Sequence, residues 1–134
     1  MPEPRGRVLL EATVSPSEDP EKVVDAVRNV AGGAHGDNEE VGRKVTLSYA
    51  DVGSLRHLRD QLRDRHIRSA ARRLLLRGKR GNKTVLMLNR QAASAGVLAV
   101  CGAPEESPLG PIYLIIISTE LDKVIDWLAA YEDG

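Results

Sequence analysis

Arginine and lysine side chains are the residues of this chain whose type and spacing most clearly indicate a chemistry. Eleven of them lie between Gly53 and Lys83, where only Asp60 and Asp64 oppose them, so the segment carries +9. The chain has 19 basic and 19 acidic residues, so the remainder holds 8 basic and 17 acidic side chains, or −9. A block of one sign differs from the mixed charges of an ordinary solvated helix. Because guanidinium groups bind phosphates through paired donors, the segment predicts a surface for an anionic partner.

We expect this partner to be RNA, read mainly by its phosphate backbone and shape. Aromatic residues make up only 3% of the chain and none lies in the basic segment, so bases find no stacking platform there. Such binding weakens steeply with added salt. The predicted RNA-binding residues are Arg56, Arg59, Arg63, Arg68, Arg72, Arg73, Arg77, Lys79, Arg80, Asn82, Lys83 and Gln91.

Two other interpretations of the basic segment stay open. The same positive field would attract an acidic protein partner, or the acidic ends of a second copy in a homodimer. The charges could also form a plain solvated face, neutralised by the acidic ends of the same chain. The arrangement of the arginines in space, on one exposed face or in local ion pairs, distinguishes these cases.

No residue pattern indicates catalysis, a metal or a cofactor. The three histidines are scattered and lack the spacing of zinc ligands. Residues 78–83 (GKRGNK) resemble a phosphate-binding loop only superficially, because they follow a helix, precede a strand and lack the final Ser or Thr of a P-loop. The acidic clusters at residues 18–21 and 39–40 are typical of solvated faces and helix starts. We therefore expect a protein that is not an enzyme.

The single cysteine, Cys101, bears on the compartment. One cysteine cannot form an internal disulfide, which favours a reducing environment, and its apolar neighbours favour a small buried side chain over a reactive thiol. The first residues (MPEPRGR) contain no apolar stretch of a signal peptide, and the longest apolar run, residues 114–117, is too short to cross a membrane. We expect a cytoplasmic protein with no membrane partner.

Periodicity predicts the elements that position the basic segment. Residues 7–14 alternate as a strand, and Asp19 followed by Pro20 starts a helix that ends at Gly32. Residues 36–38 form a loop and residues 41–50 a second strand, with Val45 and Leu47 facing inward. Residues 54–76 are helical, but leucines at 55, 58 and 62 lie almost opposite the apolar stripe at 67, 71 and 74. This predicts two helices with a break near residues 65–66.

The remaining elements complete a small α+β domain. A basic glycine loop at 78–82 leads to a strand at 84–89, a short turn at 91–93, a central strand at 112–118 and a last helix. The predicted order is β-α-β-α-α-β-β-α. The chain length fits a single domain over residues 1–134. The simplest packing is two layers, a mostly antiparallel or mixed sheet with the helices on one face.

Five stretches resemble the archaeal uncharacterised protein family 0201. They are residues 15–23 (SPSEDPEKV), 71–78 (ARRLLLRG), 81–84 (GNKT), 88–93 (LNRQAA) and 106–112 (ESPLGPI). The resemblance implies an α+β fold similar to the large-subunit ribosomal protein that binds 5S RNA, an archaeal cytosolic setting, and RNA binding related to a predicted exosome-associated family. Residues 88–93 and 106–112 are interpreted first as structural, and alternatively as shaping a groove beside the basic loop.

Overall fold

Six strands form one antiparallel sheet in the order β2-β3-β1-β6-β4-β5. The computed structural model describes residues 3–131. The strands are β1 (Arg7–Thr13), β2 (Asp37–Val41), β3 (Lys44–Tyr49), β4 (Lys83–Leu88), β5 (Val100–Cys101) and β6 (Ile112–Ile117). The expected α+β class with a mostly antiparallel sheet is confirmed.

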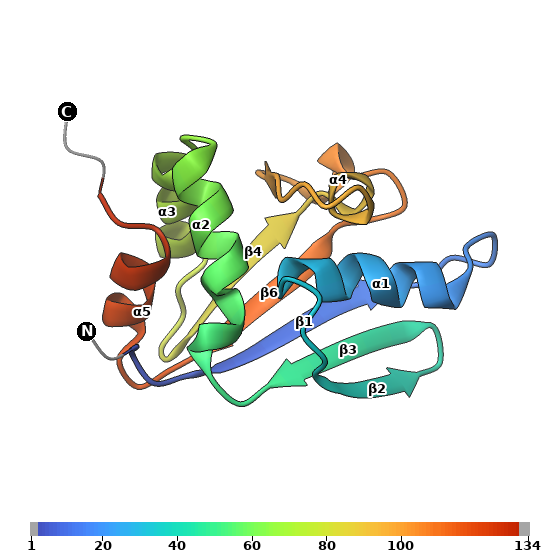
Figure 1. Cartoon of the computed structure of the whole chain (residues 1–134), viewed down its shortest axis with the longest axis horizontal. Helices are drawn as coiled ribbons and strands as arrows, with labels where there is room; N and C mark the ends of the chain where they lie inside the picture. Colours follow the sequence, from blue (N-terminus) through green and yellow to red (C-terminus); the bar gives the residue numbers. More distant parts are fainter. Residues whose placement is uncertain (1–2, 132–134) are drawn as a thin grey trace.

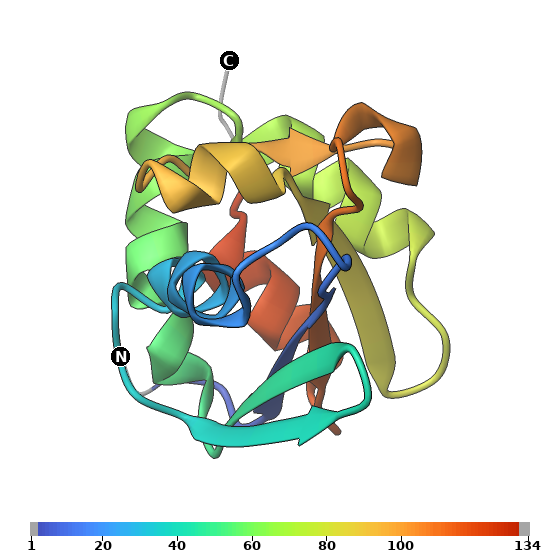
Figure 2. The same ribbon diagram turned by 90° about the vertical axis from the view of Figure 1, so that its right-hand side faces the viewer.

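The helices gather on one side of this sheet (Figures 1 and 2). They are α1 (Pro20–Val30), α2 (Arg56–Asp64), α3 (Arg68–Arg77), α4 (Arg90–Ser94) and α5 (Leu121–Leu128), with short 3₁₀ turns η1 (Val52–Leu55) and η2 (Pro104–Glu106). None of the helices in residues 3–131 is long and apolar enough to cross a membrane.

The central pair, β1 and β6, shows why one face is covered. Val8 and Leu10 of β1 pair with Ile116 and Leu114 of β6, and all four side chains are withdrawn from water. Their neighbours in each strand point to the opposite face, because side chains alternate along a strand. Burial of a Leu or Ile side chain contributes about 1.5–3 kcal/mol, so this inner face must be covered by apolar helix faces.

The predicted break within residues 54–76 is confirmed. Helix α2 ends at Asp64 and α3 starts at Arg68, and His66 between them has a positive φ of 57°. The amide of Ile67 donates to the carbonyl of Leu62 at 3.0 Å, which closes the turn. The chain can therefore present Leu58 and Leu62 from one helix, and Ala71 and Leu75 from the next, to the same core.

Two predictions of local structure were wrong. Residues 36–50 form a hairpin rather than a loop and one long strand: Asp37 and Asn38 belong to β2, and Gly42 at φ 61° turns the chain into β3. Every residue of β2 is exposed, so the apolar alternation that marks a buried strand is missing. Residues 91–93 lie in the short helix α4 rather than in a turn, because the Asn89 side chain accepts a hydrogen bond from the Ala92 amide at 2.9 Å and caps it.

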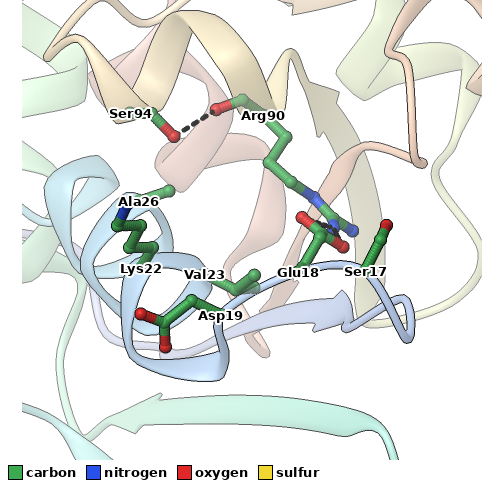
Figure 3. Close-up of a pocket in the computed structure, with 8 residues that line it drawn as sticks. All are labelled: Ser17, Glu18, Asp19, Lys22, Val23, Ala26, Arg90 and Ser94. Carbon is green, nitrogen blue, oxygen red and sulfur yellow. Dashed lines mark hydrogen bonds and ion pairs between the residues drawn. The ribbon is translucent and has the colours of Figure 1, made fainter.

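A buried ion pair joins α4 to the loop before α1 (Figure 3). The Arg90 side chain is only 4% exposed, and its Nη1 lies 2.7 and 3.0 Å from the two carboxylate oxygens of Glu18. The Arg90 amide donates to Ser107 Oγ at 3.0 Å, and Ser107 Oγ donates to the Gly110 carbonyl at 3.0 Å. Three of the stretches quoted for the resemblance thus meet around Arg90, which supports their structural interpretation.

The protonation of Glu18 follows from this setting. Burial acts to raise its pKa, but the hydrogen bonds from the Ser15 amide and from Arg90, together with the charge of Arg90, outweigh burial and hold the pKa below its ordinary value of 4.5. A carboxyl with a lowered pKa in the folded state stabilises the fold above its unfolded pKa, and this contribution is lost as pH falls through the folded pKa.

We predict that Glu18→Gln lowers the free energy of unfolding at neutral pH by about 3 kcal/mol, because it leaves the guanidinium of Arg90 buried without its carboxylate. Chemical denaturation at pH 7 and at a series of acidic pH values measures this. The difference between the variant and the wild type should narrow as the pH falls from about 4.5, the ordinary pKa of the carboxyl, and should be lost as the pH falls through the lower pKa of folded Glu18. The exposed Glu105→Gln is the control, and an equal effect there would contradict the prediction.

Candidate nucleic-acid interface

The basic side chains of α2 and α3 point away from the core, but most of them already have partners within the molecule. On α2, Arg56 forms an ion pair with Glu3, and Arg63 lies 3.6 Å from Asp60 and 3.1 Å from Asp64. These pairs are exposed, so each contributes only about 0–1 kcal/mol, but they reduce the positive field above α2.

The last helix, α5, supplies acidic and aromatic partners to the basic segment. Lys79 Nζ lies 2.5 Å from a carboxylate oxygen of Asp122. The guanidinium of Arg59 lies over the Trp127 ring at 4.9 Å from its centre. The basic segment and the acidic C-terminal part of the chain therefore neutralise each other in part. This agrees with the interpretation in which the acidic ends of the same chain neutralise the basic segment.

Arg72 is the most strongly held of these side chains. Its Nη1 donates to Asp126 at 2.7 Å and to the Ala129 carbonyl at 3.2 Å, and its guanidinium lies 4.0 Å from the centre of the Tyr131 ring. The hydrogen bond to Asp126 raises the pKa of Arg72 further above its ordinary value. Only 13% of its side chain is exposed. Arg72 thus joins α3 to the segment that follows α5.

On α3 and the turn that leads into β4, four exposed basic side chains make no ion pair with a carboxylate of residues 3–131, and we name them the open basic patch. The patch consists of Arg73, Arg77, Arg80 and Lys83, all exposed. Arg73 and Arg77 are one helical turn apart on α3, so they share a face. Arg80 Nη1 donates to the carbonyls of Arg77 at 3.2 Å and Lys79 at 2.7 Å, which holds it against the end of α3.

A tight turn continues the patch from α3 into β4. Arg80 and Lys83 exchange backbone hydrogen bonds of 2.8 and 3.1 Å, and Gly81 between them has a φ of 60°. A side chain at that φ would be strained, so glycine permits the turn. The exposed Asn82 lies at its tip. The patch thus lies on adjacent segments, the second half of α3, the turn and the first residue of β4, which we call the ridge.

The other predicted residues lie apart from this ridge. Arg68 is half-buried and is engaged within the molecule. Gln91 is exposed on α4, beyond the far end of β4 from Lys83, and six residues of strand separate the two ends by about 20 Å. Residues 88–93 therefore do not lie beside the basic turn, whereas the loop before residues 106–112 is in contact with the patch, because Arg77 Nη2 donates to the Gly102 carbonyl at 3.4 Å.

The hollows of the molecule do not coincide with the patch. One, of about 340 Å³, lies beside Arg90 and is lined by residues that include Glu18, Asp19, Lys22 and Ser94 (Figure 3). It is lined by two acidic and two basic side chains, Glu18, Asp19, Lys22 and Arg90. The Nη2 and Nε of Arg90 are buried away from solvent. In residues 3–131, no three His, Cys, Asp or Glu side chains converge as metal ligands. The buried thiol of Cys101 has its pKa raised by burial and by the charge of Glu106.

We predict that Arg72→Gln lowers the free energy of unfolding by about 1–2 kcal/mol, because it removes the ion pair with Asp126 and the stacking on Tyr131. The adjacent Arg73→Gln, which removes the same charge from an exposed position, should change stability by less than about 0.5 kcal/mol. Thermal and chemical denaturation of the two variants test this pair. Equal losses would show that Arg72 is not a packing residue.

The comparisons with known proteins agree with this fold. A UPF0201 protein of Sulfolobus acidocaldarius is 39% identical over 124 residues, which cover 91% of this chain and 86% of that protein. One from Aeropyrum pernix is 38% identical, covering 93% of this chain and 85% of the relative. The crystal structure of a UPF0201 protein from Methanococcus jannaschii has a TM-score of 0.78 and 28% identity, covering 96% of both chains. A DUF54 protein of Methanothermobacter thermautotrophicus shares the fold, with a TM-score of 0.60 and 21% identity over 90% of this chain and 92% of that one.

A family model described as RNA binding matches residues 7–118, which include all of α2, α3 and the basic turn. The likeness to a ribosomal protein fold stays a prediction. Taken together, the matched model and the curated relatives show that this chain belongs to the archaeal UPF0201 family.

Proposed function

We propose that this protein binds RNA through the open basic patch of Arg73, Arg77, Arg80 and Lys83. The observation that carries the proposal is the division of the basic side chains. Arg56, Arg63, Arg72 and Lys79 form ion pairs within the fold, whereas these four lie on adjacent segments, have no carboxylate partner in residues 3–131, and bond internally only through backbone carbonyls that accept from Arg77 and Arg80. The description of the family model supports the same class of ligand.

The ridge suits a phosphate backbone better than exposed bases. Its donors are three guanidinium groups and one ammonium group, which match phosphate oxygens in charge and geometry. Asn82 at the tip of the turn adds an amide that can bind a ribose or a base edge. No aromatic side chain belongs to the ridge, so a base would find nothing to stack on. We therefore propose that the ligand is a structured RNA, read by backbone and shape.

This proposal is narrower than the set of residues predicted from the sequence. Arg59, Arg72 and Lys79 would have to leave α5 before they could contact a phosphate, and Gln91 lies about 20 Å from Lys83. An acidic protein would be attracted by the same patch, since the field does not distinguish the sources of negative charge. Direct binding of RNA is therefore the property to measure.

We predict that the wild type retains a structured RNA in a filter-binding assay, with an affinity that falls steeply as salt is added. Arg73→Gln with Arg77→Gln should weaken binding and reduce the slope of log affinity against log salt by about 1.4–1.8, because each lost phosphate contact removes about 0.7–0.9. Arg80→Gln with Lys83→Gln should act in the same way.

The matched control is Arg56→Gln with Arg63→Gln, which removes the same two charges from exposed, paired positions on α2. Its salt slope should stay close to that of the wild type. No retention of RNA by the wild type at low salt would refute the proposal. If the control variant lost as much RNA affinity as the two patch variants, then net charge, rather than the patch, would attract the RNA.

A further inference from the structure

The side of the sheet that faces away from the helices is uncovered and apolar at its centre. Because strand neighbours alternate, the residues on this side are those between the buried positions of β1, β6 and β4. They form two registered rows, in which Leu9 is opposite Ile115 and Ile115 opposite Val85, while Tyr113 is opposite Met87. Ile117 extends the same surface. All six side chains are half-buried, shaded by one another rather than by a second layer.

Figures 1 and 2 show no helix lying across this side of β3, β1 and β6. We name it the outer sheet face. Its apolar centre is continuous across the three strands β1, β6 and β4, whose side chains share the face by their register. A contiguous apolar patch that is rimmed by polar residues on a protein surface can mark a protein contact.

Charged residues surround this centre in equal numbers. The basic ones are Arg7, Lys44 and Lys83, and the acidic ones are Glu11, Asp37 and Glu39, so the face has no net charge. Lys44 and Glu11 show that the strands share this side, since their charged groups lie 3.3 Å apart. The acids of β2 lie at one edge and Lys83 lies toward the other, on the far side of β1 and β6.

This charge pattern selects the occupant. RNA is disfavoured, because three carboxylates would face its phosphates and Tyr113 alone could stack on a base. A strongly acidic or basic protein would gain nothing from a neutral face. A second copy of the chain matches it, because a two-fold axis along the strands places the acidic β2 edge of one copy over the β4 edge of the other.

The size of the face is adequate for a dimer. Four strands spaced about 4.8 Å apart, with six residues rising about 3.3 Å each, cover about 19 by 20 Å, and β2 widens this further. With β2 the flat projection is about 480 Å², the accessible area of a pleated surface exceeds its projection, and a stable interface buries roughly 800 Å² per partner. Two sheets packed in this way lie about 10 Å apart, as in a β-sandwich.

We propose that the protein forms a two-fold dimer by packing the outer sheet faces of two copies against each other. Both helical layers then lie on the outside of the assembly, so Arg73 and Arg77 of α3 stay exposed in each copy. The inference does not depend on RNA binding, although Lys83 of the open basic patch lies at the rim of the proposed interface.

Sedimentation equilibrium over a wide range of protein concentration tests the proposal. The wild type should be dimeric, and Leu9→Thr with Ile115→Thr should raise the dissociation constant by at least about tenfold. The change removes the apolar centre, and the introduced Thr is β-branched and therefore suits a strand. The matched control is Leu76→Thr with Val97→Thr, two apolar residues that are 43% and 39% exposed on other parts of the surface. It should not change the dissociation constant.

A second variant keeps the proposal testable if the first variant fails to fold. Asp37→Lys with Glu39→Lys changes exposed residues of β2 and brings the face from zero to +4, so it should weaken the dimer without affecting the core. A monomeric wild type at all concentrations, or dissociation constants unchanged in both variants, would overturn the proposal. Loss of RNA retention by the folded Thr variant, with its association state unchanged, would also overturn it, by assigning the face to RNA.

Discussion

The aliphatic side chains of β1 and β6 that face the helices are fully withdrawn from water, and the positions of the other elements follow from them. Because the chain has no Phe and few other aromatic residues, this core is filled by branched aliphatic side chains that must interlock closely. The helices cover one side of the central strands with separate apolar faces. The turn at His66 allows α2 and α3 to do so from different directions. Covering one side only has a direct consequence, because the opposite side keeps its own apolar side chains in contact with solvent.

The same packing determines which basic side chains form ion pairs within the molecule and which stay available to an anionic ligand. Once α5 lies against α2 and α3, its carboxylates meet the nearest basic side chains, and Arg72 and Lys79 become part of the structure. The opposite charges that sum to zero in the composition thus also lie beside one another in the folded molecule. What remains positive is the outer face of α3 and the turn into β4, which α5 does not reach. The anion-binding surface is therefore smaller than the basic segment of the sequence, and it is more sharply located.

The buried Arg90 has a different role from the other arginines. It holds the loop before α1, the start of α4 and the loop before β6 together at the end of the sheet opposite the basic turn. A charge in such a place is costly unless it is paired, so Glu18 and Arg90 depend on each other. The two ends of β4 are therefore specialised: the first carries the exposed cationic turn and the second an internal ion pair that maintains the fold.

The sequence by itself determined the α+β class, the inward faces of β1 and β3, the break between α2 and α3, and the segment that carries the positive charge. These features are local, since they depend on periodicity, caps and composition over a few residues. It did not show that residues 37–41 form a strand, because an exposed edge strand such as β2 has no apolar alternation and is held only by backbone pairing to β3. Nor did the sequence distinguish Arg72 from Arg73, or Arg90 from the exposed arginines, since an arginine can either form an ion pair within the fold or stay exposed to a ligand. Only the tertiary structure decided this, because the partner of a charge is set by which distant segment folds against it: Asp126 beside Arg72, Glu18 beside Arg90, and no carboxylate of residues 3–131 beside Arg73.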